Sequence, residues 1–97
     1  VESLVEVNSK YIDEVSAIYP NPVGEFADIE VGMKETGDVR IDMLNQYGQV
    51  VFAIEEQLPT GNNKIDLDVQ SLSPGLYIVR VQANDGISRV RKFVKLR

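Results

Sequence analysis

Apolar and polar residues alternate with a period of two along most of the chain after residue 15, which is typical of half-buried strands. The alternation predicts strands over Phe26–Val31, Asp38–Asn45, Val50–Glu55, Lys64–Asp68, Leu76–Ala83 and Ile87–Leu96. The apolar residues expected to point inward are Val39, Ile41, Met43, Val50, Phe52, Ile54, Ile65, Leu67, Tyr77, Val79, Val81 and Ala83. In the first strand Phe26 and Ile29 have opposite parity, which allows a bulge or a change of face.

Turn residues separate these strands at short intervals. Gly48 and Gly86 are expected to close hairpins because glycine tolerates a positive φ. Residues 58–63 are predicted to form a loop, and Leu72–Gly75 a turn. About seven short strands without a helical stretch predict an all-β fold, an immunoglobulin-like antiparallel β-sandwich. The cysteine pair and core tryptophan of antibody domains are absent, so this likeness concerns architecture only.

Residues 1–15 carry mixed signals, with apolar residues at both helical and strand spacing. We expect them to be a linker or the tail of a preceding module, docked on the domain or exposed to cleavage. Residues 16–97 are expected to form one domain. The chain begins with Val1 rather than methionine, so we expect a piece of a longer protein.

The composition argues against an enzyme and against cofactors. The 97 residues include no cysteine and no histidine, so disulfides, thiolate metal sites and histidine-based triads are excluded. Acidic residues alternate at Asp28 and Glu30 and at Asp66 and Asp68. This spacing is typical of the solvated face of a strand, with a catalytic pair or calcium site as the alternative.

Charge is unevenly distributed along the chain. Residues 1–85 contain 5 basic and 15 acidic residues, a balance of −10, whereas the last twelve contain 5 basic residues and no acid. The acidic body argues against nucleic-acid binding. The basic end either meets an anionic partner or is neutralised by the chain's own carboxylates.

The segment Tyr19-Pro20-Asn21-Pro22 precedes the first clear strand. The two prolines fix φ and remove two backbone donors, and each restricts the residue before it to extended geometry. The segment is therefore expected to set the entry of the chain into the sandwich and to prevent pairing at an edge. Direct recognition by a partner is the alternative role.

The order of these motifs resembles the C-terminal sorting domain of type IX secretion cargo, a family of Bacteroidetes-type bacteria. The matching features are Tyr19-Pro20-Asn21-Pro22, the hairpin with Gly48, the strand with Leu72, Gly75 and Tyr77, the turn with Gly86, and Lys92 in the terminal strand. The resemblance covers residues 16–97. It implies a seven-stranded sandwich, which agrees with the strand count above.

The resemblance implies a non-catalytic secretion signal without small-molecule substrate. Its expected partners are the outer-membrane translocon, shuttle proteins and a surface sortase, so that membrane association arises only through this machinery. Cargo of the family crosses the periplasm and reaches the cell surface or the medium. The sortase commonly removes the domain and joins the cargo to anionic lipopolysaccharide.

The terminal strand carries the residues expected to be recognised, namely Arg89, Arg91, Lys92, Lys95 and Arg97. Lys92 alternates with apolar residues, so it is expected on the inward face, where it must reach solvent or an acid. The other four are expected to form an outward row. That row either meets an acidic groove or discourages edge pairing, and the edge itself could receive an added strand.

Two other functions fit a small sandwich. One is a fibronectin-like module that binds carbohydrate or a neighbouring domain, and the other is a spacer. Aromatic residues make up 7% of the chain and tryptophan is absent, which disfavours sugar stacking.

Overall fold

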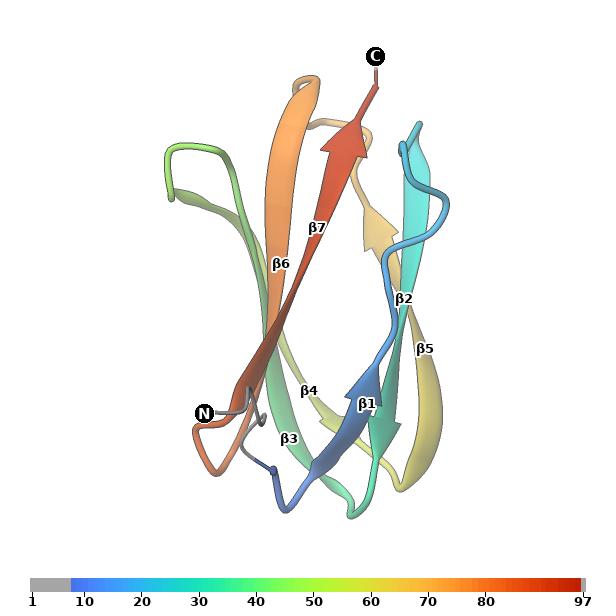
Figure 1. The fold of residues 1–97 in the computed structure, drawn as a ribbon, viewed down its shortest axis with the longest axis vertical. Coiled ribbons are helices and arrows are strands. Elements are labelled where there is room, and N and C mark those ends of the chain that lie inside the picture. Colours follow the sequence, from blue (N-terminus) through green and yellow to red (C-terminus); the bar gives the residue numbers. More distant parts are fainter. Residues whose placement is uncertain (1–7, 97) are drawn as a thin grey trace, which may run out of the picture.

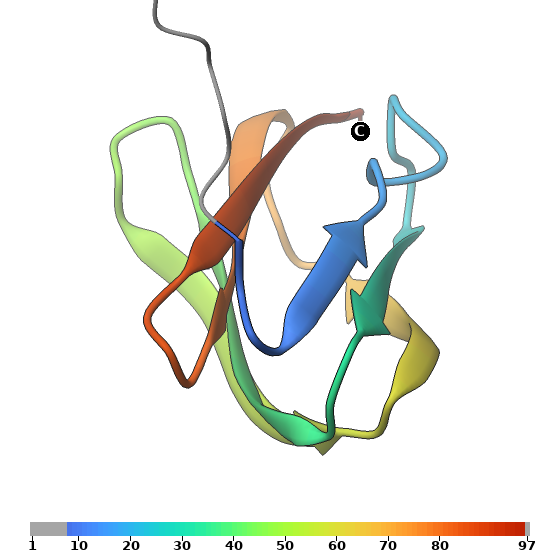
Figure 2. The same ribbon diagram turned by 60° about the horizontal axis from the view of Figure 1, so that its bottom comes forward.

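The computed structural model describes residues 8–96. This part of the chain forms seven strands: β1 (Ile12–Val15), β2 (Phe26–Met33), β3 (Gly37–Leu44), β4 (Val50–Leu58), β5 (Gly61–Asp68), β6 (Gly75–Ala83) and β7 (Ser88–Lys95). They pair antiparallel in two sheets, ordered β1-β2-β5 and β4-β3-β6-β7. Figures 1 and 2 show the sheets as two facing layers, which confirms the predicted all-β sandwich.

The core lies between the two layers and follows the period-two pattern. In β3 and β6 alternate residues are buried, from Val39 to Met43 and from Tyr77 to Ala83, as predicted. The inward residues of β2 are Ala27, Ile29, Val31 and Met33. Burial of these branched and aromatic side chains is the main stabilising term of such a domain.

Residues 9–15 are part of the sandwich rather than a linker. β1 pairs with β2, and Ile12 and Val15 are 1% and 3% exposed. The hydroxyl of Ser9 donates to Asp85 over 2.9 Å and accepts from the Ile12 amide. A free linker is therefore wrong for this stretch, and the alternative expectation of a segment docked on the domain describes it better. Residues 1–7 lie outside the described part. β1 has only four residues, so the spacing of its apolar residues cannot distinguish a strand from a helix.

Three further expectations need correction. β2 pairs with β5 in continuous register from Phe26 to Met33, so no bulge occurs there, and Phe26 points outward. The predicted loop over residues 58–63 is shorter, because β4 ends at Leu58 and β5 begins at Gly61. Val50 is 52% exposed, because the register with β3 shifts beside it, whereas Phe52 and Ile54 pack on the core as expected.

The predicted glycine turns are confirmed. Gly48 and Gly86 have φ of 80° and 82°, the left-handed region that glycine enters at little cost. Each turn is closed by a polar side chain, because Asn45 accepts from the Gln49 amide and Asp85 from the Ile87 amide. The Asp85 pKa is lowered: burial would raise it, but bonds from Lys10, Ile87 and Ser9 to the carboxylate outweigh that effect.

Candidate functional site

Two of the sequence motifs, the Tyr19–Val23 segment and the stretch from Leu72 to Tyr77, meet at the last residues of β7 (Figure 1), whereas Gly48 and Gly86 lie in the β3–β4 and β6–β7 turns. The Tyr19–Val23 segment lies along the outer edge of β7. Val23 donates to the Val94 carbonyl over 2.7 Å and accepts from the Leu96 amide over 2.8 Å. Asn21 Oδ1 accepts the Val94 amide over 3.1 Å. The proline-rich segment therefore closes this part of an otherwise open strand edge.

Tyr19 fixes the other side of that segment to β2. Its backbone pairs with Asp28, and its hydroxyl donates to Glu30 over 2.5 Å. This hydrogen bond raises the pKa of Tyr19 to about 12, and it holds the pKa of Glu30 below its usual range, with help from Asn62. Pro20 and Pro22 lie in exposed turns within the segment. These contacts support the structural role expected for Tyr19-Pro20-Asn21-Pro22.

The loop before β6 holds β7 from inside the sandwich. Lys95 is 6% exposed, and its Nζ donates to the Leu72 carbonyl over 2.8 Å. The Tyr77 hydroxyl donates to the Ser73 carbonyl over 2.6 Å, and the Tyr77 ring stacks on Phe93 with centroids 5.5 Å apart. Gly75, with φ of 150°, begins β6 at this point. The loop carbonyls thus receive one donor from each of the last two strands.

Arg91 joins β7 to the opposite sheet. Its Nε and Nη2 donate to the Val15 carbonyl over 3.1 and 2.8 Å, and its Nη1 donates to the Val90 carbonyl over 2.8 Å. Arg89 is half-buried and donates to the Ser88 carbonyl. A guanidinium has a rigid fork of donors, so Arg91 can bind carbonyls of two strands at once.

The predicted faces of β7 are reversed in the structure. Arg89, Arg91 and Lys95 point toward the interior or its rim, whereas Lys92 is exposed on the outer face. The prediction of an outward basic row and the prediction of an inward Lys92 are therefore both wrong. Phe93 determines the orientation because it is the large aromatic residue of the strand and shares the parity of the basic residues. Arg97 lies outside the described residues.

One charged cluster was not predicted. Asp42 is 1% exposed although it faces outward from β3, because Arg40 and Arg80 enclose its carboxylate at 2.8 and 2.7 Å. Arg40 also donates to Glu55 over 3.0 Å. The signal in the sequence was the alternation of acid and base on neighbouring predicted strands, where opposite charges on one face attract.

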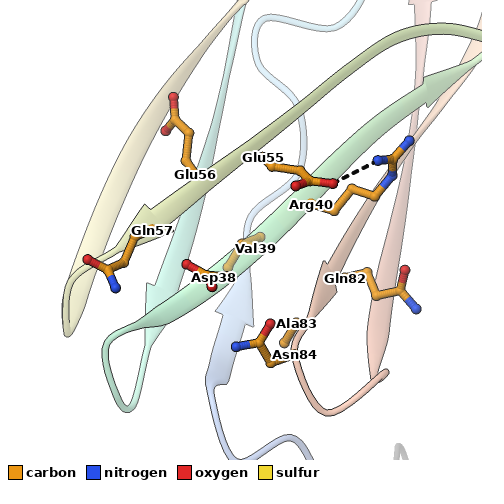
Figure 3. A pocket seen from close by; sticks show the side chains of 9 residues that line it. All are labelled: Asp38, Val39, Arg40, Glu55, Glu56, Gln57, Gln82, Ala83 and Asn84. Atoms are coloured by element: carbon orange, nitrogen blue, oxygen red, sulfur yellow. Dashed lines mark hydrogen bonds and ion pairs between the residues drawn. The ribbon is translucent and has the colours of Figure 1, made fainter.

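A hollow of about 430 Å³ lies beside this cluster, and Figure 3 shows mainly polar side chains around it. Its acids are Asp38, Glu55 and Glu56, and its base Arg40 is bound to Glu55. Among residues 8–96 no group of three or more acids is arranged to hold a metal ion. The same residues include no helix that is long and apolar enough to cross a membrane.

Comparison with known proteins gives a family match, and the solved structures that resemble the chain include two with low similarity. The family model described as "Secretion system C-terminal sorting domain" matches residues 17–96. A β-glucuronidase from Parabacteroides merdae superposes with a TM-score of 0.46 at 18% identity, over 89% of this chain and 13% of that chain. A hypothetical protein from Pyrococcus horikoshii OT3 gives 0.46 at 11% identity, over 92% of both chains. Both scores are below 0.5, so neither similarity bears on function.

Proposed function

Because the chain belongs to the secretion system C-terminal sorting domain family, we propose that it delivers its cargo through the outer-membrane translocon by displaying its terminal strand. The family membership identifies a sorting signal of the type IX system, a secretion domain rather than a catalytic one, which interacts with that machinery and is exported to the surface or secreted. We further propose that the cargo passes through the periplasm, and that translocon and shuttle proteins read the folded sandwich.

The observation that carries the proposal is that two motifs, Tyr19-Pro20-Asn21-Pro22 and the one that begins at Leu72, meet at the end of β7. Asn21, Val23, Leu72 and Arg91 all make hydrogen bonds that position this strand or its side chains. Motifs far apart in the sequence therefore serve one end of the domain. Rigid positioning of a recognition element lowers the entropy lost on binding and so favours affinity. Lys92 remains the basic residue of this strand with the most accessible position.

Removal of the domain by a surface sortase, with attachment of the cargo to anionic lipopolysaccharide, is the finer part of the proposal. A protease binds exposed, extended backbone. Residues 9–15 are held by hydrogen bonds to Asp85 and by pairing with β2, so they are poor substrates. The cut is expected before Ser9, between the domain and its cargo.

The test is surface exposure of a periplasmic reporter fused ahead of residues 1–97, in a strain with a type IX translocon and in one lacking it. We expect the reporter at the surface only in the first strain. Truncation at Arg91 is a poor control, because it removes the core residue Phe93 and unfolds the domain. Retention in both strains, with the domain folded by circular dichroism, would contradict the proposal and favour a binding or spacer module.

A further inference from the structure

The outer face of β6 and β7 exposes a continuous group of apolar side chains. Leu76 lies directly opposite Val94, and Ile78 directly opposite Lys92. The exposed fractions are 42% for Leu76, 41% for Val94, 46% for Val90 and 52% for Leu96. Side chains opposite one another in adjacent strands are close enough to touch. We call the set Leu76, Ile78, Val90, Lys92, Val94 and Leu96 the β6–β7 face.

Contiguous exposed apolar side chains mark interaction sites more often than single ones do. The exposed Phe26 does not continue this group, because it lies on the opposite sheet against Asp68, whereas the exposed Tyr47 and Val51 line one hollow together with Leu76. On the β6–β7 face five apolar residues surround Lys92, and the next base of this face, Arg80 opposite Val90, is bound to Asp42. The buried centre of a protein interface is apolar and depleted in charged residues, so a partner that covers this face must supply an opposite charge for Lys92.

Lys92 indicates the charge of the occupant. The neighbouring bases of this sheet, Arg40 and Arg80, are bound to Asp42, whereas Lys92 makes no ion pair with any residue in the described part of the chain. An acidic group on an apolar partner surface would complement this lysine. The same acidic group would be repelled by the acidic outer face of β2 and β5. That face carries Asp28 and Asp66 in direct register.

Two other occupants fit less well. A second copy paired about a two-fold axis through the β6–β7 face would bring one Lys92 against the other, and like charges repel. Strand addition at the end of β7 is obstructed, because Val23 and Asn21 already occupy the backbone groups of Val94 and Leu96. The open surface at this end is therefore the sheet face rather than its edge.

We infer that the β6–β7 face docks on an apolar protein surface that presents a carboxylate to Lys92. The inference rests on the proposed function, because the partner is then a component of the export machinery. It replaces the basic row as the recognition surface and assigns Arg91 and Lys95 to positioning the strand.

The experiment measures surface reporter in the fusion described above for three variants. They are Lys92→Gln, Lys92→Arg and the double variant Leu76→Thr/Val94→Thr, whose β-branched residues suit a strand. We expect Lys92→Gln and the double variant each to lower surface reporter by about tenfold, which corresponds to a loss of about 1.4 kcal/mol in binding free energy. Lys92→Arg retains export because the charge is kept.

Matched controls lie on the other sheet, where Lys64→Gln and Phe26→Thr remove the same chemistry from exposed positions. We expect both to be exported normally, and all variants to keep the melting temperature of the wild-type chain. Normal export of Lys92→Gln and the double variant would overturn the inference and leave the proposed function standing. Failure of the wild-type fusion would overturn both.

Two further measurements identify a wrong occupant. Sedimentation of the purified chain as a dimer that Val94→Thr dissociates would overturn the inference in favour of a second copy. Flotation with phosphatidylcholine–phosphatidylglycerol vesicles that Lys92→Gln abolishes would overturn it in favour of an anionic membrane. A monomer that does not float agrees with a protein partner.

Discussion

Replacement of Arg91 tests whether β7 is held to the opposite sheet by a side chain. Arg91 donates twice to the Val15 carbonyl, at 3.1 and 2.8 Å, and once to the Val90 carbonyl, at 2.8 Å. The informative variants are Arg91→Gln, which loses the charge, and Arg91→Lys, which keeps it. A lysine ammonium is a point charge without the planar fork, so it cannot reproduce the contact with both carbonyls.

The expected loss follows from these bonds. A hydrogen bond from a charged donor contributes about 1.5–3 kcal/mol when it is buried, and partial exposure lowers that figure. Arg91 is half-buried. We therefore expect Arg91→Gln to lower the free energy of unfolding by about 1–2 kcal/mol, which corresponds to roughly 4–16 °C in melting temperature for a domain of this size. Arg91→Lys should lose at least half as much.

Urea unfolding of the purified chain measures this change, and Lys92→Gln is the matched control. It removes one charge from the adjacent position of β7, but Lys92 is exposed, so the loss should stay within about 0.5 kcal/mol. Hydrogen exchange gives a local readout, because loss of the Val15 contact should accelerate the Ser16 amide that bonds Glu30. Equal stability of Arg91→Gln and Lys92→Gln, with unchanged exchange of the Ser16 amide, would refute the anchoring role.

Three other substitutions probe separate contacts. Asn21→Ala should lower the free energy of unfolding by about 0.5–1 kcal/mol, a small loss because water can replace the lost hydrogen bond, and it should accelerate exchange of the Val94 amide. Unchanged exchange of that amide would contradict the hydrogen bond from Val94 to Asn21. Gly37→Ala should cost about 1–3 kcal/mol, because the new Cβ would lie 2.8 Å from the Tyr11 ring; a melting temperature equal to wild type would contradict the close contact. Asp28→Asn should raise the melting temperature at pH 7 but not near pH 3. The hydrogen bond with Asp66, and then burial, raise the Asp28 pKa, so protonated Asp28 stabilises the fold at low pH and this stabilisation is lost as pH rises through the raised pKa. An equal shift in melting temperature at both pH values would refute this sign.

Each of these variants has a control in the same chain. Gly24→Ala adds a Cβ with no atom within 4 Å and should leave stability nearly unchanged. Asp13→Asn removes an exposed carboxylate of β1 and is the control for the loss of one negative charge from the three-stranded sheet. Asn84→Ala lies in an exposed turn and should leave exchange in the terminal strand as it is.

The central strands were predictable because their apolar residues share one parity. Val39 and Met43 in β3, and Val79 and Val81 in β6, are buried on one face as their alternation indicates. A one-residue shift would expose the whole set, so the pattern alone determines the orientation. The hairpin turns were predictable for a similar reason, because few residues other than glycine tolerate a positive φ.

The orientation of β7 was not predictable from alternation. Its even positions hold one serine, two valines and Lys92, whereas its odd positions hold three bases and Phe93. Counting apolar residues favours the wrong face. Burial of Phe93 against Tyr77 determines which face of β7 points inward. The inward face tolerates Arg91 and Lys95, because these side chains bury their methylene stems and donate to carbonyls at the rim of the core.

The chain's first described residues and its last strand hold each other in place. Ser9 contacts Asp85 in the β6–β7 turn, and the Val15 carbonyl accepts from Arg91. The Tyr19–Val23 segment pairs with the end of β7. In each of these contacts the two residues are more than seventy positions apart along the chain, so the contacts form only when both sheets are assembled. If the machinery reads the β6–β7 face, the signal is complete only in a folded domain. Destabilising an anchor such as Arg91 should then lower export without touching the face itself.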